Sequence, residues 1–377
     1  MDVIYSIGSK FAGGGIGNVA YHAVKGIWMK GLLNKLLCTD FRKTEIPDSK
    51  IVKLSPAHKF GLLLGFAREH LYGNVNSYSY KDKFYDYLAS MYIGNCEIFH
   101  GWNNHSLYSL RKAKKFDAKT VVERNSAHPK EQIRLLKEGD IKCKGNLNQS
   151  ALKRSCRELE ECDYIIVPST FVKRSFIKRG YSESKLIQIP QGVNLEKFKP
   201  NMNRTGIFRG LFVGNISERK GIHYLVEAWS DLDLEDSELL ICGSIRKEMK
   251  NLAQKYKKEE SISFTGYVPT LPYEKADFLV LPSLEDGFGL VVLEAMASGL
   301  PVIISENTGA KDLVKEGTQG FIVPVREPEA ISERIRYFYD NPGEVERMGK
   351  NARKKAENYS WNEYQDKLVK AYEDIIK

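Results

Sequence analysis

The segment from Phe278 to Ile304 limits most strongly what this chain can fold into. It contains an apolar run that ends at Pro282, an acidic turn with two glycines, an apolar run that ends at Gly299, and a third run, Val302–Ser305. This order predicts a strand, a turn, a helix and a second strand. Because neither strand alternates apolar with polar residues, we expect parallel neighbours that are buried on both faces of a sheet.

The turn of this unit, Glu285–Gly289, has the character of an anion site. A helix N-terminus presents free N–H groups and favours negative charge, and Gly287 and Gly289 allow close approach to the backbone. Asp286 and Glu294 are eight residues apart and add carboxylates, which accept hydrogen bonds from hydroxyl groups. A ligand with both a diphosphate and hydroxyl groups fits this turn, so we expect a nucleotide-sugar.

Two further glycine-bearing loops follow predicted strands. The loop Gly214–Gly221 places Arg219 and Lys220 before a predicted helix, where adjacent cations offset the charge of a departing diphosphate. Near the N-terminus, Gly14 and Gly15 lie between a strand and a helix, an arrangement that cradles phosphates. Glycine runs and solvated cations are common, so a position without a functional role is the alternative for each loop.

The segment from Phe278 to Ile304 resembles the signature of the retaining glycosyltransferases of family 4, which have the GT-B fold. The match includes Pro-Ser, a Gly-Phe-Gly-Leu turn, a second acid eight residues after the first, Ala-Met-Ala and Gly-x-Pro-Val. Asp286 departs from the pattern, because it replaces the usual first Glu and is one methylene shorter; Glu285 is a candidate substitute. The resemblance implies an α/β protein with two Rossmann-like, doubly wound domains that face a central cleft.

The resemblance also implies domain boundaries. Residues 1–195 are expected to form an N-terminal domain on the acceptor side, and residues 196–359 a C-terminal domain that binds the nucleotide-sugar. Residues 187–200 resemble the family's closing segment of the first domain and its hinge. The predicted terminal helix, residues 360–377, is expected to cross back onto the N-terminal domain.

Both domains are expected to contribute to the donor site. The donor-binding residues that the resemblance implies are Gly14, Gly15, Arg219, Lys220, Val268, Gly287, Phe288, Gly289, Leu290 and Glu294. Lys220 matches the Lys that holds the pyrophosphate in the family, whereas Asn215 replaces the usual Arg, for which Arg219 is the candidate substitute. Glu294 is expected to contact the ribose, and Val268 lies in the loop that holds the base through its backbone.

Three residues are expected to act in catalysis: Lys220, Asp286 and His128. In the family a His often follows directly after the strand that corresponds to Lys119–Glu123; here His128 lies further along, so a structural loop histidine is the alternative. Attack from the face on which the diphosphate leaves would retain the configuration without the paired carboxylates of a glycosidase. No cofactor and no metal are expected beside the donor, because Asp231–Asp233 is predicted to be a solvated loop.

The net charge of +9 is unevenly spread. Residues 1–200 hold 33 Lys and Arg against 19 Asp and Glu, whereas residues 201–377 hold 24 against 29. The basic half indicates contact with an anionic membrane surface or an acidic glycan, or simply solvated lysines. The apolar segment Phe60–Ala67 is a candidate for membrane contact, with core or acceptor-cleft lining as the alternative. Nucleic acid is not expected as a partner, because no aromatic-basic module of known type occurs.

The cysteines and the first residues predict where the protein resides. Six cysteines without a Cys-x-x-Cys pair indicate a reduced, cytoplasmic protein. No signal peptide is evident, and no apolar run approaches the span of a bilayer. We therefore expect a cytoplasmic protein, with peripheral contact at the inner face of the membrane.

Three functions compete. The first is a retaining hexosyltransferase that moves a sugar from a UDP- or GDP-linked donor to a glycan or lipid-linked acceptor, in cell-envelope or exopolysaccharide synthesis. The second is a GT-B-like sugar-nucleotide epimerase, and the third is a non-catalytic basic protein that binds membranes or glycans. The acidic turn favours the first function. Because Asp286 and Asn215 depart from the family pattern, an inactive transferase is a further alternative. The motifs do not specify the sugar, the base, the acceptor or the oligomeric state.

Overall fold

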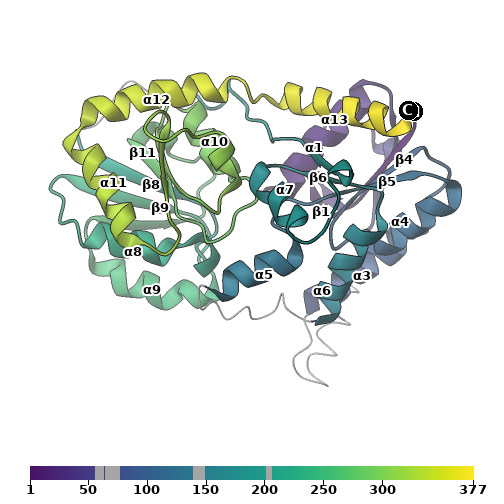
Figure 1. The fold of residues 1–377 in the computed structure, drawn as a ribbon, viewed down its shortest axis with the longest axis horizontal. Coiled ribbons are helices and arrows are strands. Elements are labelled where there is room, and N and C mark those ends of the chain that lie inside the picture. The colour runs from purple at the N-terminus through teal and green to yellow at the C-terminus, as the bar shows by residue number, and fades with distance from the viewer. Residues whose placement is uncertain (56–62, 64–76, 139–148, 201–205) are drawn as a thin grey trace.

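The computed structural model of this chain describes residues 1–55, 63, 77–138, 149–200 and 206–377. Its strands form two parallel sheets, each covered by helices, which lie side by side in Figure 1. Phe60–Ala67, the candidate segment for membrane contact, lies outside the described residues except for Leu63.

The N-terminal sheet has seven parallel strands in the order β3-β2-β1-β4-β5-β6-β7. The strands are β1 (Val3–Phe11), β2 (Leu33–Phe41), β3 (Ile51–Lys53), β4 (Ile98–Trp102), β5 (Lys119–Glu123), β6 (Tyr164–Val167) and β7 (Leu186–Gln188). The helices are α1 (Ile16–Met29), α3 (Ser77–Ser90), α4 (Leu107–Ala113), α5 (Pro129–Lys137), α6 (Gln149–Glu161) and α7 (Thr170–Ile177). Alternate residues of β1 enter two different apolar clusters: Tyr5 belongs to one and Ile4 to the other. Both faces of the sheet are therefore buried.

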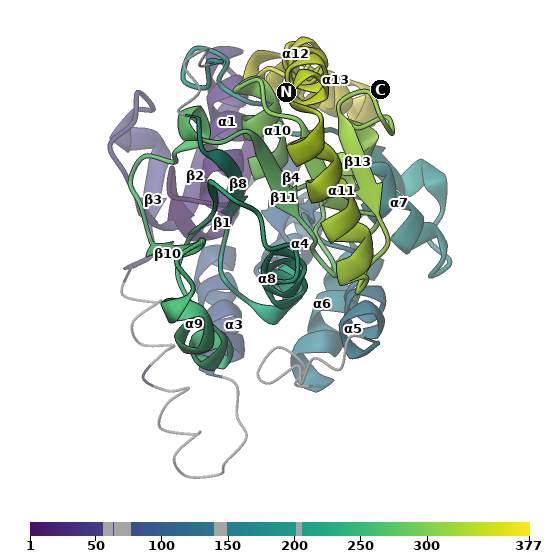
Figure 2. The ribbon, with the colours of Figure 1, turned by 90° about the vertical axis from the view of Figure 1, so that its left-hand side faces the viewer.

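The C-terminal sheet has six parallel strands in the order β10-β9-β8-β11-β12-β13. The strands are β8 (Phe208–Val213), β9 (Ser237–Cys242), β10 (Ile262–Gly266), β11 (Phe278–Leu281), β12 (Val302–Ser305) and β13 (Gly320–Val323). The helices are α8 (Ile222–Ser230), α9 (Lys250–Lys255), α10 (Leu290–Ala297), α11 (Pro328–Asp340) and α12 (Pro342–Ala356). Figure 2 views this domain from its outer side, where α8 and α11 pack against each other.

The order of strands reverses once in each sheet. In the N-terminal sheet β1 lies between β2 and β4, and in the C-terminal sheet β8 lies between β9 and β11. In each case one neighbour is the next strand in the chain, and the other comes from the second half of the domain. In doubly wound sheets, ligands bind in the crevice at the carboxyl ends of the strands beside this switch point. The loops that follow β8 and β11 are those that the sequence singles out.

The chain passes between the domains at two adjacent places. Helix α12 lies along the C-terminal domain, and α13 (Trp361–Ile376) lies on the N-terminal domain against α1 (Figure 1). The Val193 N–H of one passage donates to the Tyr359 carbonyl of the other at 2.8 Å. Tyr364 and Tyr372 on α13 are buried among N-terminal core residues, so α13 is part of that core.

Candidate functional site

The loops after β8 and β11 lie in direct contact at the switch point of the C-terminal sheet. The Leu284 N–H donates to the Arg219 carbonyl at 2.9 Å. Gly221 ends the first loop with a φ of 67°, and a Cβ at this position would lie 2.0 Å from the Pro282 carbonyl oxygen. Both the left-handed backbone and the lack of space require glycine here. This glycine therefore brings the cation-bearing loop and the acidic turn together.

Lys220 and Asp286 form an ion pair between these two loops. The Lys220 ammonium donates to Asp286 Oδ2, and both side chains are largely buried. Burial alone would raise the pKa of Asp286, but the positive charges of Lys220 and Arg219 outweigh it and hold the pKa below its usual value. Burial lowers the pKa of Lys220, which the Asp286 charge partly offsets. Two of the residues expected in catalysis are thus in contact.

Arg219 lies beside this pair, and among the described residues only its Nη1 donates hydrogen bonds. Its Nη1 donates to the main-chain oxygen of Glu285 at 2.8 Å and to Glu285 Oε2 at 3.1 Å. Within the described part of the chain, neither Nε nor Nη2 of Arg219 makes a hydrogen bond, and 35% of the side chain is exposed. A guanidinium has five N–H donors, so an edge is open to an anion. Asn215, which stands where the family has an Arg, is exposed.

Glu285 connects the two domains instead of facing a ligand. It is completely buried; its Oε1 accepts from the Ala127 N–H at 2.9 Å, and its Oε2 accepts from Gln132 Nε2 at 2.8 Å. Ala127 and Gln132 belong to the N-terminal domain. The expectation that Glu285 could replace the longer acid at position 286 does not hold here, because its oxygens are already occupied by protein donors.

Gly287 also lies against the N-terminal domain. A Cβ on Gly287 would lie 2.2 Å from the Asn125 carbonyl oxygen, and the Gly287 carbonyl accepts from Ser169 Oγ at 2.6 Å. The same Ser169 hydroxyl caps α7 by accepting from the Val172 N–H at 3.2 Å. The close approach that Gly287 permits is therefore one between two protein loops.

The remaining residues expected at the turn lie on or near α10. Gly289 precedes the helix with a φ of 75°, and Leu290 packs against both the N-terminal and the C-terminal cores. Phe288 is buried in the C-terminal core, so only its backbone is available to a ligand. Glu294 accepts from the Tyr273 hydroxyl at 2.8 Å, and burial raises the pKa of its carboxyl. The start of α10 thus lies at the boundary between the domains.

The other predicted donor-site residues are spread around this boundary. Gly14 and Gly15 are exposed at the end of β1, with open space where a Cβ would lie. Val268 follows β10 and packs against the C-terminal core. Their roles in donor binding stay predictions, as do those of the other site residues.

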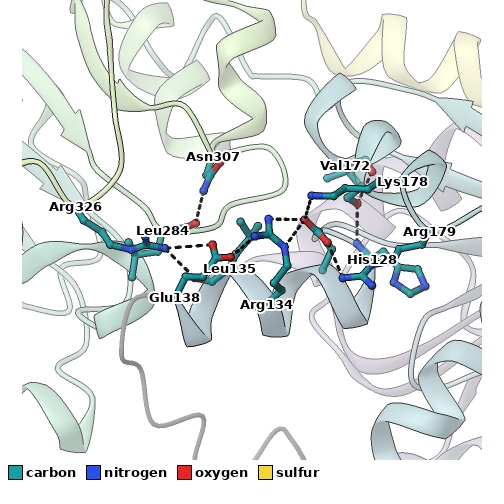
Figure 3. Close-up of polar contacts among 12 residues, drawn as sticks. His128, Arg134, Leu135, Glu138, Val172, Lys178, Arg179, Leu284, Asn307 and Arg326 are labelled. Atoms are coloured by element: carbon teal, nitrogen blue, oxygen red, sulfur yellow. Dashed lines mark hydrogen bonds and ion pairs between the residues drawn. The ribbon is translucent and has the colours of Figure 1, made fainter.

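His128 is placed differently from Lys220 and Asp286. Its imidazole caps α5 by accepting from the Lys130 N–H at 3.3 Å and packs against the rings of Phe176 and Tyr181. Burial and nearby cations lower its pKa to about 3, so it is neutral at pH 7. Figure 3 shows it beside Arg179 on the N-terminal domain. Among the described residues, its contacts do not include the acidic turn.

The contacts between the domains were not foreseen. Besides those of Glu285 and Gly287, the Thr170 N–H donates to Asp312 Oδ2 at 2.6 Å, and Arg326 Nη2 donates to the Leu135 carbonyl at 3.3 Å (Figure 3). Ser169 is predictable from the sequence as a helix cap, but the carbonyl to which its hydroxyl donates lies 118 residues away. No local pattern indicates that partner.

Metal-ligand groups and membrane-spanning helices are both absent from the described residues. In the ranges that the structure describes, no three His, Cys, Asp or Glu side chains are grouped as metal ligands would be. Nor does any helix in those ranges have the length and apolar character that a bilayer crossing requires. Contact with a membrane surface stays a prediction, since its candidate segment is not described.

Comparison with known proteins finds similarity to glycosyltransferases, and the match to a family model lies in the C-terminal half of the chain. Residues 196–355 match the family model of glycosyl transferases group 1. An uncharacterized glycosyltransferase of Methanocaldococcus jannaschii is 33% identical over 234 residues, which are 56% of this chain and 60% of that protein. D-inositol 3-phosphate glycosyltransferase of Corynebacterium urealyticum is 25% identical over 346 residues, 84% of this chain and 75% of that protein. The capsular polysaccharide biosynthesis glycosyltransferase CapM of Staphylococcus aureus is 28% identical over 235 residues, 56% of this chain and 62% of that protein.

Solved structures give the fold. Sucrose-phosphate synthase from Thermosynechococcus elongatus superposes with a TM-score of 0.75 at 18% identity and covers 100% of this chain and 99% of that one. HepE from Anabaena, in complex with UDP-glucose, superposes with a TM-score of 0.69 at 16% identity and covers 99% of both chains. The expected GT-B fold is confirmed over the whole chain.

Proposed function

We propose that this chain is a glycosyltransferase that uses a nucleotide-sugar donor, because residues 196–355 match the family model of glycosyl transferases group 1. One observation carries the proposal. Arg219, Lys220 and the N-terminus of α10 converge at the switch point of the C-terminal sheet, and the turn beside them contacts the N-terminal domain. A nucleoside diphosphate fits cations and a helix N-terminus in this place.

The chemistry that we propose is departure of the diphosphate with charge neutralisation. As the bond between sugar and phosphate breaks, negative charge grows on the diphosphate oxygens, and Arg219 and Lys220 stabilise it more in the transition state than in the ground state. Asp286 holds the Lys220 ammonium at the turn. The Asp286 carboxylate also accepts a backbone hydrogen bond from Phe288, and we propose that its remaining lone pairs accept from a hydroxyl group of the donor sugar.

The stereochemistry and the ribose contact extend this proposal. We propose transfer of a hexose with retention of configuration, in which the acceptor hydroxyl attacks from the side that the diphosphate leaves. Glu294, held by the Tyr273 hydroxyl, is in a position on α10 to accept from ribose hydroxyl groups. The UDP-glucose complex of HepE supports a UDP-linked donor, with a GDP-linked donor as the second choice.

The acceptor that we propose is a glycan or a lipid-linked glycan of the cell envelope. The support is the likeness to the capsular polysaccharide glycosyltransferase CapM. The acceptor would bind on the side of the N-terminal domain, where Gly14 and Gly15 form an exposed loop.

A melting screen followed by a turnover assay tests the proposal. A ligand that binds only the folded protein raises its melting temperature, by an amount that grows with its concentration over its Kd. We expect UDP or GDP to do so, and the matching nucleotide-sugars to release free nucleoside diphosphate slowly by hydrolysis and faster with acceptor. Lys220→Met is the control and should abolish both effects. If neither diphosphate raises the melting temperature and no nucleotide-sugar is turned over, the proposal is wrong.

A further inference from the structure

The domain contact at Glu285 leads directly to one of the cations of the proposed donor site. Glu285 Oε2 accepts from Gln132 Nε2 at 2.8 Å and from Arg219 Nη1 at 3.1 Å. One carboxylate oxygen thus receives a hydrogen bond from the N-terminal domain and another from the cation-bearing loop. Movement of the Gln132 side chain would change the position of the atom that holds Arg219.

The N-terminal side of this contact is rigidly built. Arg124, which is buried, donates from Nε to the Ala127 carbonyl at 2.8 Å and from Nη2 to Gln132 Oε1 at 3.0 Å. Ala127 and Gln132 are the two residues that donate to Glu285. Arg124 therefore fixes both donors in the geometry that the Glu285 carboxylate requires.

Burial explains why this carboxylate needs the N-terminal domain. Glu285 has no exposed surface, and a buried carboxylate is stable only when hydrogen bonds and opposite charges replace its hydration. When the domains are in contact, three donors do so. When the domains separate, the hydrogen bonds from the Ala127 N–H and from Gln132 Nε2 are lost, and water reaches the carboxylate. Among the described residues, the Arg219 side chain then donates hydrogen bonds only to Glu285.

We propose that Glu285 is a positioning residue through which the N-terminal domain orients Arg219 toward the diphosphate of the donor. This inference rests on the proposed function and adds domain contact as a condition for diphosphate binding. The main-chain oxygen of Glu285 also holds Arg219 Nη1, at 2.8 Å, and the carboxylate that Gln132 and Ala127 fix adds the second hydrogen bond that sets its orientation. The open edge of the guanidinium, with Nε and Nη2, then faces an anion that the neighbouring Lys220 also attracts.

The test compares binding of nucleoside diphosphates and monophosphates in variants of the full chain. Gln132→Met removes both the donor to Glu285 and the acceptor of Arg124 Nη2, and keeps a side chain of similar volume. By calorimetry we expect about three- to tenfold weaker binding of UDP, or of GDP if that is the base accepted, as for loss of one hydrogen bond. The proposal assigns Arg219 to the phosphate that UMP and GMP lack, so binding of these monophosphates should be unchanged. Glu285→Gln should weaken diphosphate binding by about tenfold or more, since a charged partner is lost.

Gln188→Met is the matched control. Gln188 Nε2 also donates from the N-terminal to the C-terminal domain, to Asp312 Oδ2 at 3.3 Å, but this contact does not lead to Arg219. We expect its diphosphate affinity to equal that of the unmodified protein. Equal losses in Gln132→Met and Gln188→Met, or no loss in Gln132→Met, would overturn the inference.

Failure of the proposed function gives a different result. If neither UDP nor GDP binds the unmodified protein, the donor assignment is wrong, whatever the variants do. If one binds and Gln132→Met leaves its affinity unchanged, the donor assignment stands and only the positioning role is lost. Should Glu285→Gln melt early and fail to fold, Gln132→Met alone decides the question, because it removes no charge.

Discussion

Glu131 on α5 offers a sharp test of the electrostatics beside the domain boundary. Its side chain is 6% exposed and accepts from Arg134 Nη2 at 2.7 Å, Lys178 Nζ at 3.1 Å and Arg179 Nη2 at 2.8 Å. Figure 3 shows these three cations converging from α5 and from the two residues that follow α7. Burial would raise the pKa of Glu131, but the hydrogen bonds from its three partners lower it from 4.5 to about 2.

This shift sets the size of the effect of Glu131→Gln. At about 1.4 kcal/mol per pKa unit, it corresponds to about 3 kcal/mol of stability at neutral pH. The partners are between 31 and 61% exposed, so solvent screening reduces the expected loss to about 1–2 kcal/mol. A lowered pKa gives stability that is present above the unfolded-state value of 4.5 and is lost as the pH falls toward 2.

Urea unfolding of the full chain, followed by circular dichroism at several pH values, measures this loss. The variant should be less stable at pH 7 and should approach the unmodified protein as the pH is lowered from 5 to 3. Glu138→Gln on the same helix is the control: its side chain is 45% exposed, so we expect a loss under about 0.5 kcal/mol. A Glu131→Gln deficit that is the same at pH 7 and pH 3, or no larger than that of Glu138→Gln, would refute the reasoning.

Three further predictions concern the site and the domain contacts. Lys220→Met should lower kcat/KM for the nucleotide-sugar by about 100- to 1,000-fold, as for loss of a group that stabilises transition-state charge; a loss under fivefold would contradict its role. Gly287→Ala should destabilise the protein by about 1–3 kcal/mol in urea unfolding, because Asn125 occupies the space that the methyl group needs; an unchanged midpoint would show that the turn can move away. Leu368→Ala on α13 should destabilise by about 2–5 kcal/mol and speed amide hydrogen exchange in β1, although β1 lies at the other end of the sequence; exchange confined to α13 would argue against a shared core.

The local elements of the donor-side domain are encoded in short segments. The two apolar runs predicted to be strands form β11 and β12, and the run between them that stops at Gly299 forms α10, which ends at Ala297. These strands are apolar throughout because both faces are buried, so composition alone identifies them. The strand predicted before Gly14 is β1, which runs to Phe11; there it pairs with Phe41 after a register shift that no local pattern reveals.

The domain contacts could not be predicted from such patterns. Glu285 and Ala127 are 158 residues apart, and their hydrogen bond depends on how two finished domains dock. For the same reason no local pattern reveals that the missing side chain of Gly287 leaves room for the Asn125 carbonyl, whereas its role in donor binding stays a prediction. His128 has the residue type for proton transfer, yet its environment of Phe176 and Tyr181 is a property of the packed fold. The sequence carries residue types and spacing, while the partner of a buried polar group is set by tertiary structure.

The position of α13 has a consequence for how the protein is made. A ribosome releases the N-terminal sheet first, but the side chains that complete one of its faces, including Tyr364, Leu368 and Tyr372, emerge only after the whole C-terminal domain. Domains generally fold as units during synthesis, starting from the N-terminal side. Here the second domain can close its core while the first still exposes apolar surface on β1 and α1. The half of the molecule that is translated first is therefore the half that is finished last, and chaperones would be needed most in that interval.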